Sequence, residues 1–103
     1  MAQHFVNLSR DEIETIALRA LAYLMSEPSL AHRFLSETGF DPALLRVAPG
    51  APEVLDGALS VLANDEAALL AFAANAGLDP LAVMTAHRAL ASDRDGRKPQ
   101  VST

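Results

Sequence analysis

The chain has 103 residues, which is enough for one domain built around one core. Half of the residues are hydrophobic, a share typical of a globular protein and too high for a disordered one. Alanine and leucine dominate, whereas β-branched and aromatic residues are scarce, and this composition favours an all-α fold. The absence of cysteine excludes disulfides, thiolate nucleophiles and cysteine metal sites.

The formal charge of −5 argues against non-specific binding to phosphate groups. The first residues contain no apolar run behind a basic start, so we expect no signal peptide. The longest unbroken apolar run, Ala67 to Ala74, is far shorter than the roughly 20 residues of a membrane span. We therefore expect a cytoplasmic protein without a membrane segment.

The first expected helix begins after Ser9, which forms a capping box with Glu12. It ends near Ser26, because Pro28 disfavours helical geometry at the preceding residue. Two apolar stripes follow the helical period, which predicts a helix packed on two sides. The first stripe is Ile13, Ile16, Ala17, Ala20, Leu21 and Leu24, and the second is Leu18, Ala22 and Met25.

A second helix is expected from Pro28 to the stop at Gly39, and a third begins at Pro42 under an Asp41 cap. A turn over residues 48–52 separates them from the next helix. The predicted inner faces are Leu30, Ala31, Phe34 and Leu35 on the second helix, and Leu44, Leu45 and Val47 on the third.

The fourth helix is expected over residues 52–64, and either Asn64 or Asp65 caps a fifth that runs to Gly77. The sixth opens at residues 79–80 and ends at Ser92. These elements predict a single helical domain over residues 9–91, a flexible N-terminus over residues 1–8 and a disordered tail over residues 92–103.

Residues 34–42 match residues 72–80 at a constant offset, and both segments contain a Gly-x-Asp-Pro turn. Apolar positions before these turns also stay in register. We predict a compact bundle of about six short helices made of two similar three-helix halves. The alternative is that two helix–turn–helix corners have converged on the same capping residues.

The segment from Ile13 to Leu90 resembles a small bacterial family catalogued as domain of unknown function number 3572. The carrying residues are Ala20-Leu21-Ala-Tyr-Leu24, Phe34-Leu35, Gly39-Phe40-Asp41-Pro42, Asp65-Glu66-Ala-Ala-Leu69-Leu-Ala-Phe72 and Gly77-Leu78-Asp79-Pro80. Because these are capping and core residues, the resemblance implies a fold and carries no assigned activity or site.

No motif for catalysis, a cofactor or a metal stands out. The three histidines, His4, His32 and His87, lack a second ligand at helical spacing, so no metal site is expected. The acidic pairs at residues 11–12 and 65–66 occupy first turns, where carboxylates stabilise the helix dipole. The sequence contains no nucleophile elbow and no glycine-rich loop, so we expect no enzyme; a small enzyme without a recognisable motif remains an alternative.

Residues 67–91 follow the spacing of a helix–turn–helix, which makes a nucleic-acid-associated regulator the main alternative function. The second helix of this corner would present Leu81, Met84, Thr85 and Arg88 to a groove of the nucleic acid. Because this set lacks most of the side chains that read bases and bind phosphates, we do not expect nucleic acid to be the partner.

Excess apolar surface is the strongest functional signal. After Glu66, the fifth helix has Asn75 as its sole polar residue, so it is either central in the domain or part of a binding surface. The inner face of the sixth helix leaves a flank of Leu81, Met84, Thr85 and Arg88. We predict that this flank contacts a protein partner or a second copy of the chain.

Overall fold

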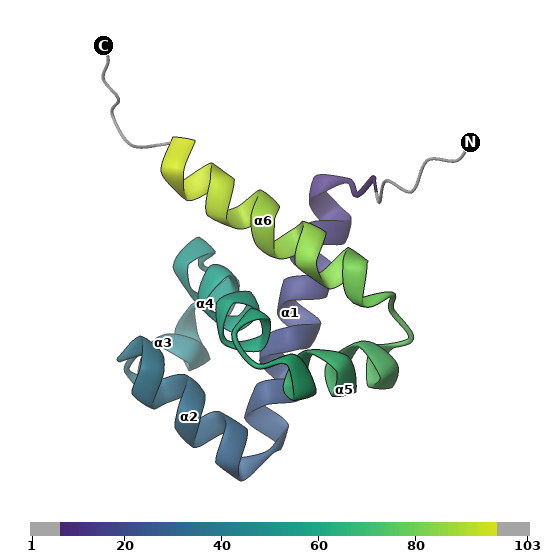
Figure 1. Ribbon diagram of the computed structural model, residues 1–103. Helices are drawn as coiled ribbons and strands as arrows, with labels where there is room; N and C mark the ends of the chain where they lie inside the picture. Colours follow the sequence, from purple (N-terminus) through teal and green to yellow (C-terminus); the bar gives the residue numbers. More distant parts are fainter. Residues whose placement is uncertain (1–6, 97–103) are drawn as a thin grey trace, which may run out of the picture.

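The computed structural model describes residues 7–96, and helices account for most of that range (Figure 1). They are α1 (Arg10–Ser26), α2 (Pro28–Thr38), α3 (Pro42–Val47), α4 (Pro52–Ala63), α5 (Glu66–Ala76) and α6 (Pro80–Gly96). The described residues contain no strand, which confirms the all-α class and the six expected helices. Residues 1–6 and 97–103 of the two predicted terminal segments lie outside the described range.

Local capping chemistry sets the helix boundaries. At the start of α1, the Glu12 amide donates to Ser9 Oγ at 3.1 Å and the Ser9 amide donates to Glu12 Oε1 at 2.8 Å, which completes the predicted capping box. Of the two candidate caps for α5, the structure selects Asp65, whose carboxylate accepts from the Ala68 amide at 3.1 Å.

The two Gly-x-Asp-Pro turns share one local geometry. Gly39 and Gly77 both adopt left-handed conformations, with φ of 74° and 70°. Two residues later, Asp41 and Asp79 each accept a hydrogen bond of 2.9 Å from the amide of the second residue of the following helix. The halves differ in length, since α3 has 6 residues and α6 has 17. The origin of the halves by duplication stays a prediction.

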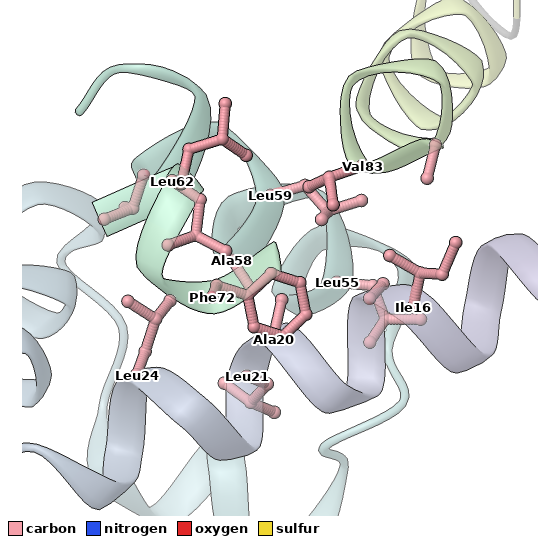
Figure 2. Close-up of a cluster of buried hydrophobic side chains, with 14 of the residues drawn as sticks. Ile16, Ala20, Leu21, Leu24, Leu55, Ala58, Leu59, Leu62, Phe72 and Val83 are labelled. Carbon is pink, nitrogen blue, oxygen red and sulfur yellow. The ribbon is translucent and has the colours of Figure 1, made fainter. Parts of the chain in front are cut away.

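The centre of the bundle is α4, which packs against α1, α2, α5 and α6. Figure 2 shows side chains from α1, α5 and α6 meeting those of α4, with the Phe72 ring of α5 beside Ala20 of α1. Helix α4 is buried on most sides, and its buried residues are Val54, Leu55, Asp56, Ala58, Leu59, Val61 and Leu62.

Of the two alternatives for α5, the structure excludes a central position, because residues on one side of this helix are exposed. Two packing expectations are wrong. The second stripe of α1 is not packed, since Leu18 is 43% exposed and Met25 is 39% exposed. Val47 is 80% exposed rather than buried in the inner face of α3. With α4 in the centre, no further helix of the described chain is available to cover these faces.

The sixth helix ends at Gly96, four residues beyond the expected Ser92. Within this extra turn, Asp93 forms an ion pair with Arg10 at the start of α1. The polar sequence after Ser92 suggested a tail, but the same residues also suit an exposed helix end next to a basic partner. This contact depends on the position of α1, which local sequence does not report.

Candidate interaction surface

One exposed side of α5 is entirely apolar. Ala67, Leu70, Ala71 and Ala74 are all exposed, and their spacing places them in one row along the helix. We call these four residues the α5 outer face. Leu70, at 47% exposure, is its largest side chain. No charged residue occurs between Glu66 and Asp79, so the whole helix after its first residue presents an uncharged surface.

The four residues predicted as a partner surface share one side of α6, and we call them the α6 flank. Leu81 is 41% exposed, and Arg88 is exposed as well. Met84 and Thr85 are half-buried, and Met84 packs against the hydrophobic core. The flank therefore offers one large exposed apolar side chain, Leu81, and one cation, Arg88.

Capping interactions fix the ends of both helices that carry these surfaces. Arg33 of α2 donates from Nη2 to Asp65 Oδ2 at 2.5 Å, which ties the cap of α5 to the neighbouring helix. The hydrogen bond from the Arg33 guanidinium, followed by that from the Ala68 amide, lowers the pKa of the Asp65 carboxyl below its ordinary value. At the other end, Gly77 and Asp79 turn the chain into α6, which lies beside α5 in Figure 1.

A shallow groove of about 390 Å³ lies between the exposed edges of α5 and α1. The sequence did not indicate this groove. The rings of Tyr23 and Phe72 lie 5.6 Å apart, centroid to centroid, along its wall. Arg19 Nη2 donates to the Ala76 carbonyl at 3.3 Å and so satisfies one acceptor at the C-terminal end of α5. Asn75 also lines the groove, and it follows Ala74 of the α5 outer face directly in the sequence.

A second cavity of about 290 Å³ lies where α1, α4 and α6 meet. Leu55 and Leu90 supply apolar lining, while Arg10, Glu14 and Asp93 supply charged groups. Arg10 and Asp93 form an ion pair with each other, so two of the three charged residues of the lining stabilise the contact between α1 and α6. It contains none of the residues of the α6 flank.

Asp56 is a buried carboxylate that the sequence reasoning missed, with 4% exposure in the middle of α4. Its position among Val54, Leu55 and Ala58, on the apolar side of the helix, was the available signal. Over residues 7–96, no three His, Asp or Glu side chains come close enough to hold a metal ion.

In the same range, no single helix is long and apolar enough to cross a membrane. Helices α4 and α5 reach that length and composition only as a pair, and they bend by 112° at their junction.

The fold and the surfaces define a small all-α bundle with an apolar exterior patch and no cluster of metal-ligating side chains in the described residues. Residues 10–93 match the family described as protein of unknown function DUF3572, and the chain belongs to that family. The predicted resemblance is therefore confirmed. No curated protein and no solved structure matches the chain.

Proposed function

We propose that this protein is a small protein-interaction module that binds through the α5 outer face and the exposed part of the α6 flank. The exposure of Leu70 on an uncharged helix face carries this proposal. A soluble helix usually places charged or polar residues on its exposed side. An exposed side made of Ala67, Leu70, Ala71 and Ala74 is instead typical of a surface that another chain covers.

Leu81 supports the same assignment from the neighbouring helix. It is 41% exposed in the first turn of α6, just after the short turn that leaves α5. Large apolar side chains bury substantial area when a partner covers them, and they act as anchors when polar residues surround them. Arg88, two turns further along α6, supplies a charged rim position.

Capture of partner proteins by covalent cross-linking in cells tests the proposal. We expect the wild-type chain to capture a protein, and we expect Leu70→Asp and Leu81→Asp to lose it, because a charge in an apolar contact must be desolvated. Val47→Asp is the matched control, since Val47 is 80% exposed on α3, away from both surfaces. Capture that is equal in all four proteins would refute the proposed surface.

Nucleic-acid binding remains the alternative. In its favour, the turn between α5 and α6 has two features of a helix–turn–helix motif. Gly77 is left-handed in the turn, and Asp79 caps the second helix. Against it, Arg88 is the sole lysine or arginine in residues 67–91. We expect no retardation of duplex DNA at physiological salt, and retardation that Arg88→Ala abolishes would make this alternative the better one.

A further inference from the structure

We propose that the cavity between α1, α4 and α6 binds a small organic cation in which an apolar body carries an ammonium group. This site is separate from the proposed protein-binding surface, because its lining includes no residue of the α5 outer face or the α6 flank. The cavity volume of about 290 Å³ is close to the lower limit of roughly 300 Å³ for small-molecule sites. It therefore fits a ligand whose body is the size of a short alkyl chain.

One side of the cavity lining is apolar. Leu55 of α4 and Leu90 of α6 belong to the hydrophobic core, and Pro52 adds ring carbons at the start of α4. Gly50 contributes no side chain, and a Cβ added there would meet no atom within 4 Å, so the turn before α4 leaves open space. An alkyl body that covers this side removes apolar surface from water, which favours binding.

The other side of the lining is charged, with two carboxylates and one guanidinium. These groups belong to Glu14, Asp93 and Arg10. Because Arg10 and Asp93 form an ion pair, the Glu14 carboxylate is left without an ion-pair partner among residues 7–96. An ammonium group carries a positive charge and three N–H donors, so it can pair with this carboxylate. Since Glu14 is exposed, the pair forms without burying either charge completely.

The helix ends around the cavity do not reverse this preference for a cation. A helix N-terminus carries a partial positive charge, but Glu53 lies in the first turn of α4, and Asp11 and Glu12 lie in the first turn of α1. Helix α6 ends at Gly96, within one turn of Asp93, and a helix C-terminus carries a partial negative charge. The local potential therefore favours a cation over an anion of the same size.

Titration with hexylammonium, hexanol and hexanoate tests the proposal, because these probes share one body and differ in the charge of the head group. Amide chemical shifts of isotope-labelled protein give each dissociation constant and locate the site. We expect hexylammonium to shift the amides of Leu55 and Leu90 with a dissociation constant on the order of 1 mM. Hexanol should bind about 2- to 5-fold more weakly, and hexanoate more weakly still.

Three results would overturn the assignment of the cavity. They are equal binding of hexylammonium and hexanol, tighter binding of hexanoate, and unshifted leucine amides at about 10 mM hexylammonium.

Glu14→Gln removes the unpaired carboxylate at nearly constant size. We expect its affinity for hexylammonium to fall about 2- to 5-fold, to that of hexanol, while hexanol binds as it does to wild type. A purely structural role of Glu14 would instead change the binding of both probes. Glu66→Gln removes the same charge from an exposed position of α5 and should bind all three probes as wild type does. Unchanged selectivity in Glu14→Gln would refute the pairing with the ammonium group.

The double variant Glu14→Gln with Asp93→Asn leaves Arg10 as the one charged side chain of the described lining. Its preference should reverse, so that hexanoate binds about 2- to 5-fold more tightly than hexylammonium while hexanol binding is unchanged. A retained preference for hexylammonium would contradict the proposal. Because Asp93→Asn also breaks the ion pair between α6 and α1, hexanol reports whether the cavity is intact. If hexanol binding is lost, Glu14→Gln, which keeps that ion pair, decides the test.

Discussion

Helices α4 and α5 are similarly apolar and adjacent in sequence, yet the fold uses them differently. Seven of the 12 residues of α4 are buried, whereas α5 buries Ala68, Leu69, Phe72 and Ala73 among its 11. The difference lies in the neighbours, because α4 has helices on several sides and α5 packs against α4, α6 and α1 on one side. An apolar helix sequence therefore predicts burial only where other elements are available to cover it.

Close packing at α4 involves the turn between α2 and α3 as well as the helices. A Cβ added at Gly57 of α4 would lie 3.1 Å from Phe40 Cε2, so glycine lets the Phe40 ring approach the helix. Phe40 in turn packs edge-on against Phe34, with ring centroids 5.9 Å apart. No comparable cover exists over the α5 outer face in the described residues.

The largest expected effects distinguish the inner positions of both helices from the outer face of α5. Leu59→Ala on α4 should lower the free energy of unfolding by about 2–5 kcal/mol, and Phe72→Ala on α5 by about 3–5 kcal/mol, because both side chains are buried. Urea unfolding of dilute protein measures both values. Leu70→Ala should cost less than about 1 kcal/mol; a cost equal to that of Leu59→Ala would mean that the outer face is covered in the monomer.

A smaller effect distinguishes two neighbouring positions of the α6 flank. Met84→Asp should destabilise the domain by about 1–3 kcal/mol, because Met84 packs against the core and a carboxylate there must be desolvated. The sequence places Met84 on a flank beside the inner face of α6, and the structure shows that this position is half-buried. Leu81→Asp should stay within about 0.5 kcal/mol of wild type in thermal unfolding. Equal melting temperatures for the two variants would contradict the half-buried position of Met84.

The two Gly-x-Asp-Pro turns should respond alike to substitution of their glycines. Gly39→Ala and Gly77→Ala should each lower the free energy of unfolding by about 1 kcal/mol, because a Cβ disfavours the left-handed conformation of both residues. Added Cβ atoms would meet no atom within 4 Å, so the cost is conformational rather than steric. Gly50→Ala, in the turn before α4, also has open space and a φ outside the left-handed region, and it should be nearly neutral.

The smallest expected effect is a pH dependence of the free energy of unfolding, which arises from the contact of Arg33 on α2 with Asp65, the cap of α5. The pKa of Asp65 is lowered from 3.8, first by the hydrogen bond from Arg33. The stability from this contact is therefore fully present above pH 3.8 and is lost as the pH falls through the lower pKa of the folded state. Arg33→Gln should flatten the acid side of the stability profile measured by urea unfolding at a series of pH values. An unchanged profile would show that the pair adds nothing to folding.

Apart from the end of α6, the sequence by itself predicted the helix boundaries and turns, from the capping box at Ser9 to the left-handed glycines at positions 39 and 77. It also identified the inner stripe of α1, every member of which is buried. The caps and turns depend on atoms within about four residues of one another, so local chemistry suffices to predict them.

Only the tertiary structure decided which apolar surfaces are covered. It left the second stripe of α1, Val47 and the α5 outer face exposed, buried Asp56 in α4, and extended α6 to the contact of Asp93 with Arg10. Each outcome depends on helices distant in sequence, because burial is set by what lies across from a side chain rather than beside it in the chain. The candidate surface was therefore half predictable: the sequence indicated the exposed position of Leu81 on α6, and it did not decide the exposure of the α5 outer face.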